Sequence, residues 1–87
     1  PLYQVVLLDD DDHTYDYIIE MLQQIFIFTM VEGYRRAEEL ERKGRSVLIV
    51  CELSEAEFAR DQIPSYGSDW RLPHSQGSMS AVIEPAE

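Results

Sequence analysis

The sequence predicts one compact domain of the α/β (α+β) class, with elements in the order β-α-α-β-α-β. Three short runs of β-branched and aliphatic residues have the composition of strands, and three segments repeat apolar residues at helical spacing. The chain has 87 residues, of which 45% are apolar. This length supports a single hydrophobic core, and there is no repeat and no linker. We therefore expect residues 1–87 to form one domain, a three-stranded sheet packed with three helices.

The first strand is predicted at Tyr3–Leu8, where the residues are mostly β-branched and aliphatic. A helix follows Thr14, which suits the N-cap because its hydroxyl can accept a hydrogen bond from an unpaired backbone N–H. Thr29 and Glu32 have the spacing of a capping box and predict the start of a second helix. Gly44 predicts its end, because glycine readily adopts the left-handed conformation that follows many helices.

The second strand is predicted at Arg45–Leu53. Ser54 and Glu57 repeat the capping-box spacing, so they predict the start of a third helix. This helix is expected to run through Ile63 and to end or kink at Pro64, because proline lacks the backbone N–H that a helix interior uses.

A long loop is predicted from Ser65 to Gly77, where two glycines, Pro73 and several serines occur. Within this loop, Trp70 is expected to cover the hydrophobic core. The alternating residues from Ser78 to Glu84 predict the last strand.

Composition excludes several function classes. The net charge of −10, from 17 acidic and 7 basic residues, argues against nucleic acid and anionic membrane as partners. One cysteine, Cys51, excludes an internal disulfide, and no apolar run approaches the roughly 20 residues of a membrane span. A reducing, cytoplasmic setting is therefore expected. Ser54 with His13 or His74 offers no credible hydrolytic triad, so no catalytic residue and no enzyme activity is predicted.

Four consecutive aspartates, Asp9 to Asp12, follow the first strand. Like charges side by side repel, so a cationic partner explains them better than local stability, although a solvated turn remains open. A phosphoreceiver domain also has acidic residues after its first strand. Here, however, the second strand ends in Cys51-Glu52, without an aspartate at the phosphoacceptor position, and the chain is too short for a five-stranded fold.

A calcium loop is another interpretation of the acidic turn. With Asp9 as position one, Asp11 and Glu20 fall at positions three and twelve. Thr14 then stands at position six, where the sharp turn needs glycine. A structural calcium site is therefore not predicted, and the sequence predicts no metal ligand and no cofactor.

Five stretches match, in order, the motifs of one known family. They are YQVVLLDDD (3–11), in register with Tyr-x-Val-x-Leu-x-Asn-Asp-Asp, YIIEMLQ (17–23), GRSVLIV (44–50), AEFARDQI (56–63) and MSAVIEPA (79–86). On these motifs the chain resembles the ClpS family, adaptors that deliver N-degron substrates to the Clp protease, and a divergent planctomycete-like branch in particular. The resemblance implies a three-stranded antiparallel sheet packed with three helices.

In this family an asparagine, an aspartate and a histidine hold the α-ammonium group of the substrate's first residue. The resemblance places Asp9, Asp10 and Glu41 at these positions. Carboxylates supply only acceptors, and charge-assisted hydrogen bonds are about twice as strong as neutral ones, so three acids suit an ammonium group. The hydrophobic pocket implied by the resemblance consists of Asp11, His13, Tyr15, Ile18, Ala37, Leu40 and Met79.

The pocket residues predict which first residue is preferred. Tyr15 stands at the family's gatekeeping methionine. Ile18 and Leu40 are each one methylene larger than the family's usual valine, whereas Ala37 replaces a longer side chain. A pocket narrowed in this way should favour Leu, Ile or Val over Trp as the first residue. Phe should also bind, because one methylene changes the binding free energy by only about 1–3 kcal/mol.

The predicted partners are peptides and proteins with a free hydrophobic N-terminal residue. The resemblance implies a second partner, the N-terminal domain of a Clp ATPase, docked through the third-helix region. Ala59 and Ser54 depart there from the family's lysine and a common glutamate. The flexible N-terminal tail of family adaptors is expected to be absent from this chain, and the protein is expected to be a monomer. Two other functions stay open: an acidic module that binds divalent cations, and a general protein-interaction module.

Overall fold

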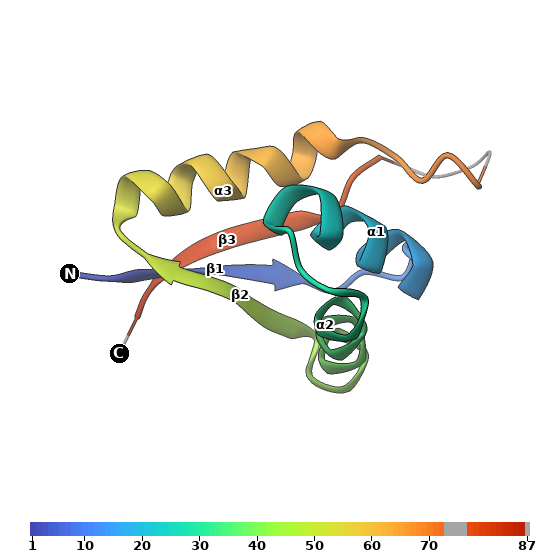
Figure 1. The fold of residues 1–87 in the computed structure, drawn as a ribbon, viewed down its shortest axis with the longest axis horizontal. Helices are drawn as coiled ribbons and strands as arrows, with labels where there is room; N and C mark the ends of the chain where they lie inside the picture. Colours follow the sequence, from blue (N-terminus) through green and yellow to red (C-terminus); the bar gives the residue numbers. More distant parts are fainter. Residues whose placement is uncertain (73–76, 87) are drawn as a thin grey trace.

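The computed structural model describes residues 1–72 and 77–86; residues 73–76 of the predicted loop, and Glu87, lie outside the described part. The fold class and the order of elements are as predicted from the sequence (Figure 1). The elements are β1 (Tyr3–Leu8), α1 (Tyr15–Phe26), α2 (Met30–Lys43), β2 (Arg45–Cys51), α3 (Leu53–Tyr66) and β3 (Ser80–Pro85).

The sheet has the strand order β2-β1-β3, and β1 pairs antiparallel with both neighbours. The central position of β1 explains its apolar sequence, since Val5, Val6 and Leu7 have no exposed surface. α3 packs against the sheet, and α1 and α2 pack on each other near the end of β1, with α2 also contacting β2 (Figure 1). The polar turn after β1 therefore emerges beside both of these helices.

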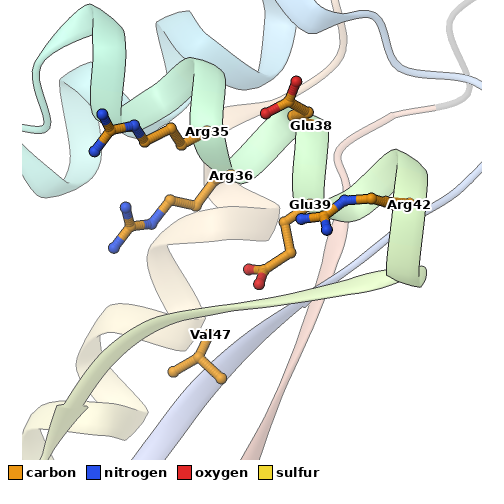
Figure 2. A pocket seen from close by; sticks show the side chains of 6 residues that line it. All are labelled: Arg35, Arg36, Glu38, Glu39, Arg42 and Val47. Atoms are coloured by element: carbon orange, nitrogen blue, oxygen red, sulfur yellow. The ribbon is translucent and has the colours of Figure 1, made fainter.

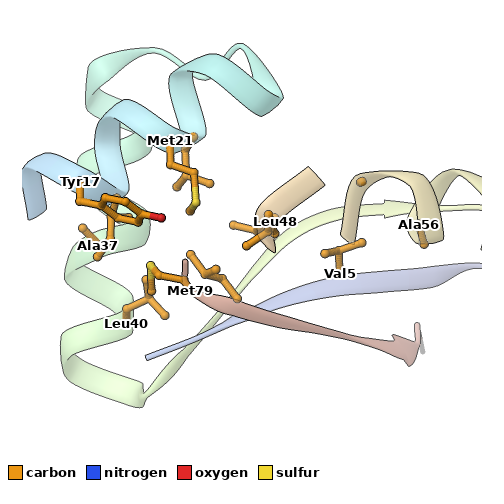
Figure 3. Close-up of a cluster of buried hydrophobic side chains, with 13 residues drawn as sticks. Val5, Tyr17, Met21, Ala37, Leu40, Leu48, Ala56 and Met79 are labelled. Atoms are coloured by element: carbon orange, nitrogen blue, oxygen red, sulfur yellow. The ribbon is translucent and has the colours of Figure 1, made fainter. Parts of the chain in front are cut away.

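The hydrophobic core joins the three helices to the sheet (Figure 3). Tyr17 and Met21 of α1, Leu40 of α2 and Ile63 of α3 are almost fully buried in it. α1 and α2 approach closely at Gly33, where an added Cβ would lie 3.3 Å from the Cα atom of Ile19. That atom belongs to the backbone and cannot rotate away, so a larger residue would push the two helices apart.

The predicted helix ends are confirmed for α1 and α2. The Thr14 hydroxyl accepts a hydrogen bond from the Tyr17 backbone N–H. Thr29 and Glu32 form both hydrogen bonds of a capping box. Gly44 has a φ of 81°, and its N–H donates to the carbonyl oxygen of Leu40 at 2.8 Å, as expected for glycine after a helix.

The predicted start of the third helix is wrong. β2 ends at Cys51, which pairs with Tyr3, the first residue of β1. Because the partner strand begins there, Leu53 has no strand to pair with and instead starts α3. Glu52 is the N-cap, without a side-chain hydrogen bond, so the predicted capping box from Ser54 does not form.

Two further boundaries differ from the prediction. α3 continues past Pro64 to Tyr66, whose ring meets that of Tyr17 edge-on at 5.5 Å and whose hydroxyl donates to Glu20. These tertiary contacts support the last turn beyond the proline. β3 begins only at Ser80, opposite Leu8, because the central strand ends at that residue.

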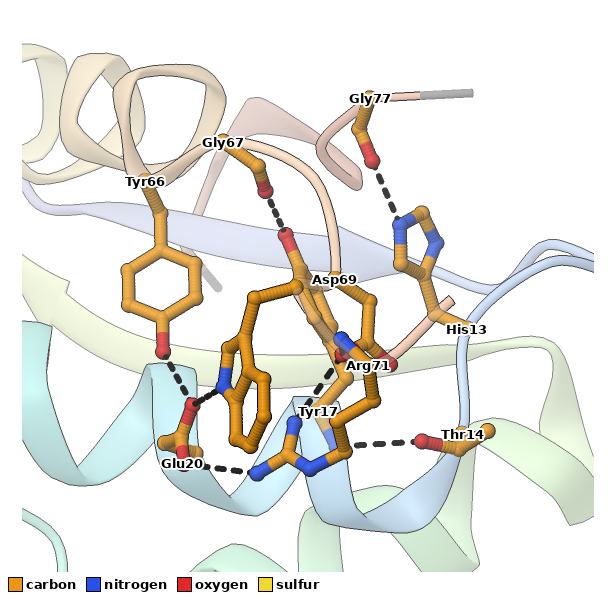
Figure 4. A network of polar contacts seen from close by, with 10 residues as sticks. His13, Thr14, Tyr17, Glu20, Tyr66, Gly67, Asp69, Arg71 and Gly77 are labelled. Atoms are coloured by element: carbon orange, nitrogen blue, oxygen red, sulfur yellow. Dashed lines mark hydrogen bonds and ion pairs between the residues drawn. The ribbon is translucent and has the colours of Figure 1, made fainter. Parts of the chain in front are cut away.

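The expectation that Trp70 covers the core is also wrong. Its side chain is 77% exposed, and its indole N–H donates to Glu20 at 3.3 Å. The Arg71 guanidinium lies 4.6 Å from the ring and pairs with Glu20 and Asp69 (Figure 4). A polar network therefore holds this segment on α1, rather than burial of the indole.

α1 ends at a strained residue. Ile27 has a φ of 56° and a ψ of 35°, in the left-handed region, and its N–H donates to the carbonyl oxygen of Leu22. L residues are disfavoured there, β-branched ones most of all. The Ile27 side chain is 87% exposed, so burial does not offset the cost.

We expect Ile27→Gly to raise the free energy of unfolding by about 1 kcal/mol, because glycine adopts this conformation without a Cβ clash. Urea unfolding followed by circular dichroism would measure the change. Ile27→Ala is the control. It also removes most of the exposed side chain but keeps a Cβ, so its free energy of unfolding should rise by less than that of Ile27→Gly. Equal stability of wild type and Ile27→Gly would contradict the inferred strain.

Candidate functional site

The three acids predicted to hold an ammonium group come together around one small hollow. Asp9, Asp10 and Glu41 all line it, and its volume is 190 Å³. The hollow lies between the turn after β1, the start of α1 and the second half of α2. Its complete lining is Asp9, Asp10, His13, Thr14, Tyr15, Ile18, Ala37 and Glu41.

Strand pairing brings these residues together. Leu8 of β1 pairs with Arg45 of β2, and the next backbone N–H, that of Asp9, donates to the carbonyl oxygen of Gly44 at 3.0 Å. Because Gly44 also ends α2, the acidic turn lies against the last turn of that helix, where Glu41 is located. The carbonyl oxygens at this end carry the negative pole of the helix dipole and add to the charge of the acids.

Asp10 is held by its own turn. One of its carboxylate oxygens accepts the backbone N–H groups of Asp12 at 2.9 Å and His13 at 3.0 Å. The His13 Nδ1 atom lies 2.8 Å from the other oxygen, and Nε2 lies 2.7 Å from the carbonyl oxygen of Gly77 (Figure 4). Both neighbours are acceptors, so both contacts are hydrogen bonds only when each ring nitrogen carries a proton. His13 thereby connects the acidic turn to the segment that precedes β3.

Tyr15 and Glu41 form a bridge between α1 and α2. The Tyr15 hydroxyl donates to a Glu41 carboxylate oxygen at 2.7 Å. This hydrogen bond is the main reason that the pKa of Tyr15 is raised to about 12, because the carboxylate stabilises the neutral phenol and repels the phenolate. The Tyr15 ring also meets the Tyr34 ring edge-on at 5.5 Å.

The predicted pocket residues divide into two groups. His13, Tyr15, Ile18 and Ala37 line the hollow. Its apolar wall comes from the buried side chains of Ile18 and Ala37. The other three are not in the lining: Leu40 and Met79 are buried in the hydrophobic core, to which Ile18 and Ala37 also belong, and Asp11 is exposed.

Thr14 lines the hollow but was not predicted to do so. The sequence predicts only its role as the N-cap of α1, which it also has. Its place in the chain, between the predicted pocket residues His13 and Tyr15, was the available signal. A residue can cap a helix and border a pocket at once, because the start of a helix lies at the surface.

Two other hollows lie away from the acidic turn. The larger, of 540 Å³, is lined by charged residues of α2 together with Val47 of β2 (Figure 2). The other, of 370 Å³, lies beside the start of α3. Within residues 1–72 and 77–86, no group of three or more His, Cys, Asp or Glu residues could hold a metal ion.

Comparison with known proteins identifies the family. The family model described as ATP-dependent Clp protease adaptor protein ClpS matches residues 1–73. The chain belongs to the ClpS family. Curated ClpS adapter proteins from Acetivibrio thermocellus and Synechococcus elongatus are each 29% identical to it, over 84 and 86 residues. The alignments cover 97% and 98% of this chain and 80% and 79% of the relatives.

A solved structure agrees with the assignment. The structure of Agrobacterium tumefaciens ClpS2 bound to L-phenylalaninamide matches with a TM-score of 0.82 and 27% sequence identity, covering 98% of this chain and 96% of that one. The protein is thus an adaptor of the Clp protease, and its family is one of adaptors rather than enzymes. Its predicted place in a planctomycete-like branch and in the cytoplasm stay predictions. In the described residues, no helix has the length and apolar character needed to cross a membrane.

We expect Glu41→Gln to lower the pKa of Tyr15 from about 12 towards its ordinary value of 10.0. The substitution removes the negative charge that opposes ionisation of the phenol. Carbon-13 NMR of the tyrosine Cζ atoms as a function of pH would measure it. Tyr66 is the internal control, because burial and then its bond to Glu20 raise its pKa to about 12 independently of Glu41. An unchanged pKa of Tyr15 in the Glu41→Gln variant would contradict the hydrogen bond between Tyr15 and Glu41.

Proposed function

We propose that the hollow binds the first residue of a peptide through its free α-ammonium group and its apolar side chain, and that the adaptor selects Clp protease substrates in this way. The observation that supports the proposal is the convergence of Asp9, Asp10 and Glu41 beside Ile18 and Ala37. Negative oxygens next to an apolar wall suit a cation that carries a hydrophobic side chain.

The carboxylate oxygens of Asp9, Asp10 and Glu41 can accept further hydrogen bonds. Within residues 1–72 and 77–86, the Asp9 carboxylate accepts no hydrogen bond, and Glu41 accepts only that of Tyr15. Asp10 already accepts bonds within its turn, which fixes its orientation. An ammonium group has three donors, so Asp9 and Glu41 can each take one and Asp10 can take the third with its remaining lone pair.

The ligand in the related structure has matching chemistry. L-phenylalaninamide, to which Agrobacterium tumefaciens ClpS2 is bound, has a free α-amino group, an apolar side chain and an amide where a peptide would continue. The related protein shares the fold with this chain over nearly its whole length. This likeness supports the same class of ligand for the hollow described here.

A Leu-initiated peptide should bind, and its N-acetylated form should not, because acetylation removes the cation and with it the charge-assisted hydrogen bonds to the carboxylates. Fluorescence anisotropy with both peptides, with and without EDTA, would measure this. Glu41→Gln should weaken binding of the free peptide about tenfold through loss of a charge-assisted hydrogen bond. Glu38→Gln removes the same charge one turn earlier on α2, at a residue that does not line the hollow, and should have a smaller effect.

The results separate the proposal from its alternatives. Equal affinity for free and acetylated peptides would refute it. Loss of binding in EDTA would favour a divalent-cation module. Equal effects of Glu41→Gln and Glu38→Gln would mean that only the overall negative charge matters, and would remove the proposed role of Glu41.

The size of the hollow limits which first residue of a ligand can bind. Its volume of 190 Å³ is below the range of about 300–1,000 Å³ of most ligand pockets. Among amino-acid amides, we therefore expect Leu, Ile and Val to bind more tightly than Trp, with Phe close behind. Titration of this series under one set of conditions would test the order. Tighter binding of tryptophanamide than of leucinamide would overturn it.

We also propose that α3 contacts the N-terminal domain of the Clp ATPase. Ala59, where the family has lysine, is 7% exposed and packs in the core. A contact in this region would therefore use neighbouring exposed side chains. Leu53 and Phe58 are 42% and 70% exposed on the same helix and are the apolar residues available.

A further inference from the structure

A group of apolar side chains on the first turn and a half of α2 has no role in the core. Met30, Val31 and Tyr34 are 66%, 58% and 47% exposed, and none of them belongs to the hydrophobic core cluster. Ile27, in the turn just before, is also exposed and is strained. Stability does not explain these residues. We refer to Met30, Val31 and Tyr34 as the apolar stripe.

The stripe continues into the hollow. Met30, Tyr34, Ala37 and Glu41 follow one another at spacings of four, three and four residues, which places them on one face of α2. The last two line the hollow. Tyr34 also meets the ring of Tyr15, another lining residue, at 5.5 Å. One helix face therefore runs from the acidic end of the hollow, past its apolar wall, onto Met30 and Tyr34. Val31 follows Met30 directly, about 100° around the helix, and borders this face.

The length of the stripe fits a short extended peptide. A helix rises about 1.5 Å per residue, so Met30 lies about 10 Å along α2 from Ala37. An extended chain advances about 3.3 Å per residue. A peptide whose first residue occupied the hollow could thus place its next three residues along the stripe.

We propose that the apolar stripe binds the second to fourth residues of the substrate when these are apolar, so that the adaptor reads more than the first residue. This inference rests on the proposed function, because the first residue has to be held in the hollow. The apolar character of the stripe, in a chain with a net charge of −10, specifies the partner: uncharged, hydrophobic side chains next to a free N-terminus.

The test uses three ligands with the same first residue: leucinamide, Leu-Val-Val-Val amide and Leu-Thr-Thr-Thr amide. Valine and threonine have nearly the same shape, so the two peptides differ mainly in apolarity. We expect the valine peptide to bind about five- to tenfold more tightly than the threonine peptide. In the double variant Met30→Gln, Val31→Gln, this ratio should fall to near one, while affinity for leucinamide stays unchanged.

Phe58→Gln is the matched control, because it replaces a similarly exposed apolar side chain on α3 and should leave the ratio as in the wild type. If leucinamide binds but the two peptides bind equally, or if the double variant keeps the ratio, the inference fails and the proposed function stands. If leucinamide does not bind, both fail. A wild-type dimer in analytical ultracentrifugation that the double variant abolishes would assign the stripe to a second copy of the chain and overturn the inference.

Discussion

The antiparallel pairing of β1 with β2 is the constraint on which the candidate site depends. Because Leu8 lies opposite Arg45, the end of β1 is next to the start of β2. The Asp9 N–H then bonds to the Gly44 carbonyl and fixes the acidic turn against the end of α2. Glu41 is thereby brought to Asp9, although the two are far apart in the chain. A shift in this register would move the turn along α2 and separate the acids.

The packing of α1 on α2 supplies the other half of the site. The close approach at Gly33 lets the start of α1 and the second half of α2 form the two sides of one hollow. Tyr15 and Glu41 then meet across it, while Ile18 and Ala37 give it an apolar wall. Exposed acids are common on protein surfaces, and so are small apolar depressions. Their combination is what suits a peptide N-terminus with a hydrophobic side chain.

Local signals allowed much of the fold to be predicted. The capping box of Thr29 and the glycine at position 44 depend on hydrogen bonds and backbone conformations within a few residues, and both occur as predicted. The signal at Ser54 failed because the end of β2 depends on where β1 begins, which is a long-range property. The prediction that Trp70 covers the core is wrong for a similar reason. Contacts with Glu20 and Arg71, which hydrophobicity does not reveal, fix the position of the indole.

The sequence by itself determined the family, the order of elements, the helix ends that depend on local caps, and the presence of an acidic turn beside apolar helices. Only the tertiary structure decided which apolar residues face the hollow. The sequence pattern predicts that Ile18 and Leu40 are both buried, and both belong to the hydrophobic core, yet only Ile18 also lines the hollow. Periodicity identifies the apolar face of a helix. The neighbouring elements decide where that face is covered and where it is left open.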